Sequence, residues 1–215
     1  MRVVIVTGGY INDTFAIEWL KKNKYDYQIA ADSGMEFFYR TGLEPNVIAG
    51  DFDSVKEEIL SFFSQNPNIK VIRLNPIKDD TDTEFAIRFA ISEGAEHITI
   101  LGATGTRFDH VIGNIHLLGI GLEEGVTIEL VDKYNRIRMV DSPFSMKKSE
   151  QFGKYVSFLP FAGNVKGVTL KGFRYPLTNA TMESFCSLGV SNEIVEEVVS
   201  MEIEEGILLM IEARD

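Results

Sequence analysis

The chain is poor in cysteine, tryptophan and basic residues. Its 215 residues include one cysteine, one tryptophan and six prolines. Because the single Cys186 has no partner for an internal disulfide, we expect a reducing compartment, the cytoplasm. Against 32 acidic residues stand only 21 basic ones, which gives a net charge of −11. This balance disfavours a nucleic-acid partner, because binding a phosphate backbone calls for a basic face.

Long hydrophobic runs are also missing. No apolar stretch approaches the roughly 20 residues that a membrane-spanning helix needs, so we expect no membrane segment. Residues 1–9 read as a short buried strand that ends in a glycine turn, and they are too short for the core of a signal peptide. Hydrophobic residues nevertheless make up 45% of the chain, which is enough to fill the core of one large domain or two smaller ones.

Residues 1–131 alternate short apolar runs with segments of helical periodicity. This alternation predicts a mainly parallel sheet with helices on both faces, a Rossmann-like three-layer α/β domain. Ligands of such domains lie outside the carboxyl ends of the strands. The predicted strands are 3–7, 28–31, 46–49, 69–74, 97–101 and 126–131. The predicted helices are 13–22, 35–41, 55–64, 82–93 and 109–118.

The pattern changes over residues 132–215, where segments of helix length disappear. Short apolar runs alternate there with glycine, proline, asparagine and serine. This predicts a second domain, an antiparallel β-sandwich, with a small barrel as the alternative. The predicted strands are 137–140, 155–160, 167–170, 196–203 and 206–211.

The first candidate site is the segment Gly50-Asp51-Phe52-Asp53-Ser54, directly after a predicted strand. In extended backbone, residues two apart point the same way, so Asp51 and Asp53 would share a face while Phe52 turns inward. Two carboxylates on one face suit Mg²⁺. The alternative is a turn followed by a helix cap, in which Asp53 or Ser54 accepts the first helical N–H groups.

The second candidate site is residues 78–84, Lys-Asp-Asp-Thr-Asp-Thr-Glu, between a strand and a helix. Thr81 and Glu84 have the spacing of a capping box, and acidic residues in a first turn complement the helix dipole. Capping leaves Lys78 and Asp79 unexplained. It also leaves two acidic loops on the same edge of the sheet, whose mutual repulsion a divalent cation would relieve.

The third candidate site is residues 102–110, Gly-Ala-Thr-Gly-Thr-Arg-Phe-Asp-His, after the strand at 97–101. Its glycines allow a close approach of backbone to a ligand, and the following helix N-terminus favours an anion. Arg107 is suited to bind a phosphate, whereas Asp109 has a capping role as its alternative. The spacing is neither that of a P-loop nor that of a dinucleotide fingerprint. Three such loops at successive strand ends predict a metal and phosphate site.

The order of these motifs resembles the thiamine pyrophosphokinase family, along nearly the whole chain. The segments that carry the resemblance are 31–34 (Ala-Asp-Ser-Gly), 50–54, 78–84, 102–110, 172–177 (Gly-Phe-Arg-Tyr-Pro-Leu) and 189–193 (Gly-Val-Ser-Asn-Glu). It implies an α/β domain followed by a β-sandwich that binds thiamine, and a homodimer. It also implies a reaction in which ATP, as co-substrate with Mg²⁺, and thiamine give AMP and thiamine diphosphate.

The resemblance also implies roles for individual residues. Metal ligands would be Asp51, Asp53 and Asp82, with Asp79 as a further catalytic candidate. Nucleotide contacts would be Lys78, Thr104, Gly105, Arg107, Asp109 and His110. Thiamine contacts would be Ser191 and Asn192, whose alternative is an ordinary turn, and Asp32, whose alternative is to order the Gly34 turn.

The stretch before the Ser-Asn pair departs from the family pattern, and the same loops are compatible with other functions. Some family members stack a tryptophan on thiamine shortly before the Ser-Asn pair, but here that stretch contains only Phe185 as an aromatic, and Trp19 reads as core. The aspartate loops would also serve another Mg²⁺-dependent phosphotransferase or nucleotide hydrolase, because a fold does not fix a substrate. A non-catalytic sensor of nucleotide or thiamine is a third alternative.

Overall fold

The computed structural model describes residues 1–75, 80–105 and 107–215, and the chain divides into two compact units, Met1–Lys133 and Tyr134–Asp215. The predicted change of pattern after residue 131 coincides with the end of β6, just before this division. Among the described residues, no helix is long and apolar enough to cross a membrane.

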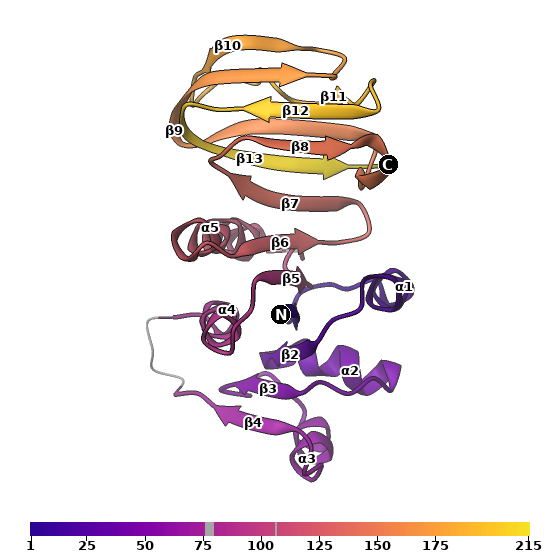
Figure 1. Cartoon of the computed structure of the whole chain (residues 1–215). Helices are drawn as coiled ribbons and strands as arrows, with labels where there is room; N and C mark the ends of the chain where they lie inside the picture. Colours follow the sequence, from indigo (N-terminus) through magenta and orange to yellow (C-terminus); the bar gives the residue numbers. More distant parts are fainter. Residues whose placement is uncertain (76–79, 106) are drawn as a thin grey trace. The chain divides into compact units, whose positions relative to one another are not determined.

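The first unit is a parallel sheet with helices on both faces (Figure 1). Strands pair in the order β4-β3-β2-β1-β5-β6. Helices α4 and α5 cover one face, and α1, α2 and α3 cover the other. The strands are β1 (Arg2–Val6), β2 (Tyr27–Ala31), β3 (Val47–Gly50), β4 (Lys70–Arg73), β5 (His97–Leu101) and β6 (Thr127–Val131). The helices are α1 (Asp13–Asn23), η1 (Asp32–Gly34), α2 (Met35–Thr41), α3 (Glu57–Ser64), α4 (Asp82–Ser92) and α5 (Phe108–Glu124).

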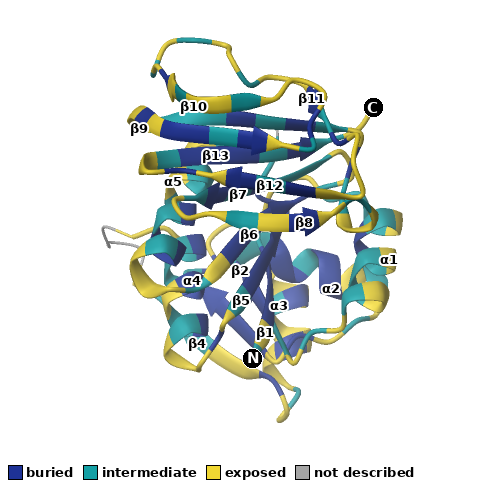
Figure 2. Ribbon diagram, turned by 45° about the horizontal axis from the view of Figure 1, so that its top comes forward, coloured by how far each residue is buried: buried dark blue, intermediate teal, exposed yellow. Residues whose placement is uncertain are grey.

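The order of the strands changes direction at β1 and β5, which pair directly with each other. The chain builds outward from β1 to β4 and then returns to place β5 on the other side of β1. The helices that follow β1 and β5 therefore cover opposite faces of the sheet, and open α/β sheets bind ligands outside the strand ends at such a point. The strands beside this point are continuous apolar runs because both of their faces are covered. The residues of β1 from Val3 to Val6 are fully buried, and the central strands appear dark blue in Figure 2.

Helix ends follow local sequence signals. The Asn12 side chain accepts a hydrogen bond from the Phe15 N–H at 3.0 Å and caps α1. Helix α5 continues six residues past its predicted end at residue 118, from Leu118 to Glu124, and stops at Gly125 with φ of 67°. Its last turns bury Ile120 and Gly121, so packing against the sheet extends the helix beyond the periodic stretch.

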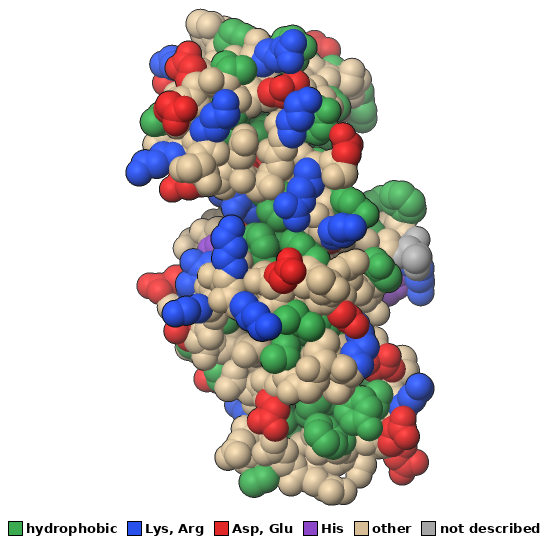
Figure 3. All heavy atoms as spheres, turned by 90° about the vertical axis from the view of Figure 1, so that its right-hand side faces the viewer, with side chains coloured by type: hydrophobic (Ala, Val, Ile, Leu, Met, Phe, Trp, Pro, Cys, Tyr) green, Lys and Arg blue, Asp and Glu red, His purple; other side chains and the backbone are tan. Residues whose placement is uncertain are grey.

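Helices α2 and α3 contact each other through aromatic rings. Tyr39 and Phe62 are both exposed, and their ring centroids lie 5.2 Å apart in an edge-to-face arrangement. Phe62 and the buried Phe63 are similarly arranged at 5.1 Å. On the face shown in Figure 3, hydrophobic side chains gather over these two helices. The aromatic contacts fix the outer helices on the β3–β4 side of the sheet.

The second unit is an antiparallel β-sandwich whose two sheets share one long strand, β9. One sheet contains β7, β13, β11 and part of β9, and the other contains β8, β12, β10 and the rest of β9. Buried residues such as Phe158, Met182 and Met201 fill the core between them. The strands are β7 (Asn135–Val140), β8 (Phe144–Lys147), β9 (Tyr155–Lys171), β10 (Leu177–Met182), β11 (Asn192–Glu193), β12 (Val198–Glu202) and β13 (Glu205–Ala213).

The predicted α/β domain followed by antiparallel strands is confirmed, with differences in the second unit. The two strands predicted at 155–160 and 167–170 are parts of β9. Ala162 and Gly163 interrupt the apolar pattern with φ of 59° and 143°, so the strand bends there and passes from one sheet to the other. The pattern did not predict the short or polar strands β8, β10 and β11.

Candidate functional site

A cavity of about 650 Å³ lies at the crevice beside the carboxyl ends of β1 and β5. Its walls come from the loops after these two strands, from η1 and from the first turns of α4 and α5. The lining residues are Thr7, Gly8, Gly9, Asp32, Ser33, Thr81, Asp82, Thr83, Glu84, Gly102, Ala103, Gly105, Arg107, Asp109, His110, Gly113, Asn114 and Leu117. The predicted nucleotide residues Gly105, Arg107, Asp109 and His110 therefore share one cavity with Asp82.

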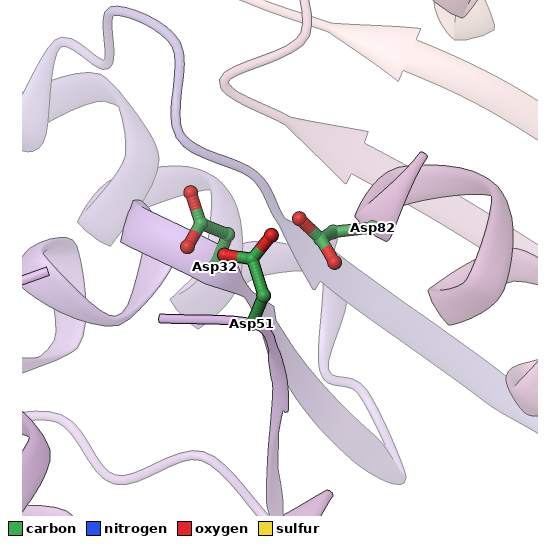
Figure 4. Close-up of side chains that lie close together, drawn as sticks. All are labelled: Asp32, Asp51 and Asp82. Carbon is green, nitrogen blue, oxygen red and sulfur yellow. The ribbon is translucent and has the colours of Figure 1, made fainter. Parts of the chain in front are cut away.

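Three carboxylates converge beside this cavity, and two of them, Asp32 and Asp82, line it (Figure 4). One oxygen each of Asp32, Asp51 and Asp82 lies within 4.8 Å of the other two. Asp32 follows β2, Asp51 follows β3, and Asp82 begins α4, so the parallel sheet brings together residues far apart in sequence. All three are half-buried. Hard carboxylate oxygens at this spacing fit a divalent cation such as Mg²⁺.

Asp32 has an unusual environment. Its backbone lies in the left-handed region with φ of 49°, where residues other than glycine are strained. Its Oδ2 accepts a hydrogen bond from the Ser54 hydroxyl at 2.7 Å. Its Oδ1 is buried and has no hydrogen-bond partner within the described part of the chain. Leaving a carboxylate oxygen buried and unpaired is costly, and a cation bound at the three carboxylates would offset that cost.

Asp51 and Asp53 do not share a face in the predicted way. The prediction assumed extended backbone, but Phe52 has φ of 65°, which makes a tight turn. Phe52 is buried, as expected, while Asp53 is exposed. The Asp53 N–H donates to Asp51 Oδ1 at 3.0 Å, so Asp53 orients Asp51 through its backbone. Asp32 occupies the place in the carboxylate group that the sequence pattern suggested for Asp53.

The start of α4 presents Asp82. The Thr81 hydroxyl accepts a hydrogen bond from the Glu84 N–H at 3.2 Å, which is the first half of the predicted capping box. The Glu84 carboxylate instead pairs with Arg88, one turn further along, at 2.8 Å. The buried Thr83 lies 2.9 Å from the Thr7 hydroxyl, so a side-chain contact joins this helix end to the end of β1.

The two glycine-containing loops pack against each other. A Cβ atom at Gly9 would lie 2.1 Å from the Gly102 carbonyl oxygen, and one at Gly102 would lie 2.4 Å from the Thr7 carbonyl oxygen. Only glycine permits this approach, and Gly102 also has φ of 78°. The loops after β1 and β5 therefore form one backbone surface at the cavity wall.

The beginning of α5 carries a pair of opposite charges at the cavity. The Arg107 Nε donates to Asp109 Oδ1 at 3.1 Å, and a second guanidinium nitrogen bonds Oδ2. This contact lowers the pKa of Asp109 to about 2, with a further contribution from the His110 N–H. Arg107, Asp109 and His110 are all exposed. Arg107 therefore offers a guanidinium close to the helix N-terminus, where an anion is favoured.

Some cavity residues were not predicted from the sequence, and one predicted residue, Thr104, is not among those that line the cavity. His110, Gly113, Asn114 and Leu117 lie on one face of α5, and the helical spacing from His110 was the signal that could have found the others. The Asn114 amide donates to the Ala103 carbonyl at 3.0 Å. Thr104, by contrast, is not among the lining residues and donates its hydroxyl to Asp132 at the end of β6.

The remaining predicted site residues that the structure describes, Ser191 and Asn192, belong to the second unit. Lys78 and Asp79 fall outside the described residues. Asn192 is buried in the second unit, where its amide nitrogen donates to the Tyr175 carbonyl at 2.8 Å and its Oδ1 accepts from the Tyr175 N–H at 2.9 Å. Ser191 is exposed with φ of 58°, and Phe185 is fully exposed. Trp19 is half-buried and donates to the Tyr25 hydroxyl at 2.8 Å.

Comparisons with known proteins cover both units. Residues 19–130 match the family described as thiamin pyrophosphokinase, catalytic domain, and residues 143–208 match thiamin pyrophosphokinase, vitamin B1 binding domain. A thiamine pyrophosphokinase from Bacillus subtilis is 35% identical over 189 residues, which is 87% of each chain.

Solved structures agree with these matches. The crystal structure of thiamine pyrophosphokinase from Bacillus subtilis has a TM-score of 0.89 and 32% identity, with complete coverage of both chains. That of thiamin pyrophosphokinase from Geobacillus thermodenitrificans has a TM-score of 0.85 and 31% identity, and the match covers 100% of this chain and 98% of the other. The chain, with both its catalytic and its vitamin B1 binding domains, therefore belongs to the thiamin pyrophosphokinase family.

Proposed function

We propose that the protein transfers the pyrophosphoryl group of ATP to the hydroxyl of thiamine, giving thiamine diphosphate and AMP. The hydroxyl oxygen forms a bond to the β-phosphorus, the bond between that phosphorus and the α,β-bridging oxygen breaks, and the hydroxyl proton is released. The observation that carries the proposal is the convergence of Asp32, Asp51 and Asp82 beside the cavity. Transfers of this kind depend mainly on positioning and on neutralisation of phosphate charge.

Asp32, Asp51 and Asp82 would hold Mg²⁺. The fit rests on the buried, unpaired Oδ1 of Asp32 and on the exclusively carboxylate character of the group. When bound, Mg²⁺ supplies positive charge against the phosphate oxygens and the developing charge of the leaving group. Asp53 supports the group through its N–H to Asp51.

Residues of the cavity wall would bind the nucleotide. The loops after β1 and β5 present backbone to the phosphates, since Gly9 and Gly102 leave no side chain between them. Arg107 would exchange its bond with Asp109 for phosphate oxygens, and His110 and Gly105 complete that wall. On the resemblance alone, Lys78 is proposed for a phosphate and Asp79 for the hydroxyl proton.

The second unit would bind thiamine, in keeping with its match to a vitamin B1 binding domain. Asn192 has both ends of its amide bonded to the Tyr175 backbone, so we propose that it shapes the loop. The exposed Ser191 is then the better candidate for a polar contact, and Phe185 for stacking. A homodimer and a cytoplasmic location are part of the same proposal.

Incubation with ATP, Mg²⁺ and thiamine tests the proposal. AMP and thiamine diphosphate are expected in equal amounts, and neither should form when thiamine or Mg²⁺ is omitted. Formation of AMP or ADP without thiamine would support a hydrolase or another phosphotransferase instead. Binding of ATP and thiamine with no turnover would indicate a sensor.

A further inference from the structure

Ser54 contacts the carboxylate group from outside the cavity. It lies in the turn between β3 and α3, it is exposed, and it is not among the cavity-lining residues. Its hydroxyl donates to Asp32 Oδ2 at 2.7 Å across a separation of 22 residues. A short hydrogen bond to an ionised carboxylate is stronger and more directional than one between neutral groups. Ser54 thus links the loop that carries Asp51 to the residue that follows β2.

The bond to Ser54 determines which oxygen of Asp32 is left over. With Oδ2 engaged by the serine, Oδ1 is the buried oxygen without a partner in the described chain. A partial rotation of the carboxylate would break the bond, and a half-turn would only exchange two equivalent oxygens. The Ser54 hydroxyl therefore opposes rotation of the side chain that approaches Asp51 and Asp82 within 4.8 Å.

The backbone of Asp32 also needs support. Its φ of 49° lies in a region that non-glycine residues occupy only when neighbouring structure enforces it. On the backbone side, Gly50 packs so closely that a Cβ atom there would lie 3.0 Å from the Asp32 Cα. On the side-chain side, the support is the Ser54 hydroxyl. Both supports come from the same β3 turn that presents Asp51.

We infer that Ser54 is a positioning residue that holds Asp32 in the orientation in which it binds the metal ion. The inference rests on the proposed function, because it assigns Asp32 to that ion. Ser54 itself is not among the residues that line the cavity. Loss of a partner that orients a metal ligand typically weakens metal affinity by about 10- to 100-fold.

The experiment measures Mn²⁺ binding to the full chain without nucleotide, by electron paramagnetic resonance. Mn²⁺ replaces Mg²⁺ as the probe because carboxylate sites suit both ions. Ser54→Ala is expected to weaken binding about tenfold, whereas Ser54→Thr, which keeps a hydroxyl, should restore most of the affinity. Ser61→Ala removes another exposed serine hydroxyl of the same unit and should bind as the wild type. The unfolding temperature should change by no more than about 4 °C in all three, because the Ser54 hydrogen bond is exposed.

Two further measurements separate positioning from a merely structural role. In an Asp32→Asn background, Ser54→Ala should cause no additional loss of Mn²⁺ affinity, because its effect acts through the Asp32 carboxylate. Wild-type affinity in Ser54→Ala would overturn the inference, as would a loss of affinity accompanied by a fall in unfolding temperature of more than about 4 °C. So would failure of the wild type to bind Mn²⁺.

The proposed function is tested separately, by measuring the thiamine diphosphate that the same wild-type preparation forms. Transfer by a wild type whose Mn²⁺ affinity does not depend on Ser54 would overturn only the positioning role. Absence of transfer together with Ser54-dependent Mn²⁺ binding would overturn the proposed function and support the role of Ser54 at a metal site.

Discussion

The hydroxyl of Thr7, at the end of β1, lies 2.9 Å from the hydroxyl of Thr83 in the first turn of α4. Thr83 is buried, and its neighbour in sequence is Asp82. The contact joins the loop after β1, which lines the cavity, to the helix that carries one of the three carboxylates. Because a buried hydroxyl needs a partner, the pair should contribute to stability as a unit.

We therefore expect Thr7→Val to lower the free energy of unfolding by about 1–3 kcal/mol, since it leaves the Thr83 hydroxyl buried and unpaired. The double variant Thr7→Val/Thr83→Val should recover part of that loss, because no unpaired hydroxyl remains. Urea unfolding of the two single variants, the double variant and the wild type measures the coupling. Thr7→Ser keeps the hydroxyl and is the control. Strict additivity of the two valine substitutions would show that the pair is not an energetic unit.

The rate of transfer should fall much more when Asp51 is changed to asparagine than when Asp53 is. Asp51→Asn removes a charge from the three-carboxylate group, and we expect transfer to fall by about 100-fold or more, which corresponds to several kcal/mol of lost charge stabilisation. Asp53→Asn keeps the backbone N–H that bonds Asp51, so its rate should stay within about tenfold of wild type.

Initial rates at saturating ATP, Mg²⁺ and thiamine measure this difference, with circular dichroism to show that both variants are folded. The two variants form a matched pair, since they make the same chemical change two residues apart. Equal losses of rate in the two variants would indicate that Asp53 is a metal ligand, as the sequence pattern suggested.

The local backbone explains why the sequence located the acidic loops but not the carboxylates that meet. The D-x-D spacing favours a shared face only in extended backbone, and the left-handed conformation of Phe52 breaks that rule. Buried Phe52 anchors the turn, and that tertiary packing is not visible in local spacing. Asp32 was recognised as a substrate or turn residue, but its position near Asp51 depends on the pairing of β2 with β3.

In the fold, likewise, elements with a clear local pattern were predicted, whereas elements that depend on long-range packing were not. The strands β1, β2, β3 and β5 were predictable because strands buried on both faces are continuous apolar runs. β9 was predicted in two pieces because its bend exposes Ala162, Gly163 and Asn164. β10 lies on β9 alone at a sheet edge and is mostly exposed or half-buried apart from the buried Met182, so its sequence carries little periodicity.

The ion pair of Arg107 and Asp109 makes a prediction about pH. The pKa of Asp109 is lowered from 3.8 to about 2, first by its hydrogen bond with Arg107. A depressed carboxyl pKa contributes stability above the ordinary pKa, and this contribution is lost as the pH falls through the depressed value. Because both side chains are exposed, the effect on global stability should be small and sensitive to salt.

The carboxyl carbon of Asp109, observed by NMR, should therefore hardly shift between pH 7 and about pH 4 in the wild type. In Arg107→Gln it should begin to titrate in that range, because the guanidinium partner is lost. Lys56→Gln removes an exposed cation elsewhere in the first unit and serves as the control. Identical titration of Asp109 in wild type and Arg107→Gln would contradict the ion pair.

Glu212 is a buried carboxylate in the sandwich of the second unit. It is fully buried, its Oε2 accepts from Arg136 Nε at 2.7 Å, and its Oε1 accepts from the Phe152 N–H at 2.9 Å. Arg136→Met should destabilise the protein by about 3–5 kcal/mol, because it leaves a buried carboxylate without its closest cation. Lys166→Met removes one partner of the exposed pair with Glu205 and should change stability by no more than about 1 kcal/mol.

Urea unfolding at neutral pH compares the two variants directly, since both replace one cation of an ion pair in the same unit by methionine. The contrast arises from solvation: water screens Glu205 when Lys166 is removed, but it does not reach Glu212. Equal and small losses in both variants would show that Arg138, whose guanidinium lies 3.9 Å from Glu212, compensates the buried charge.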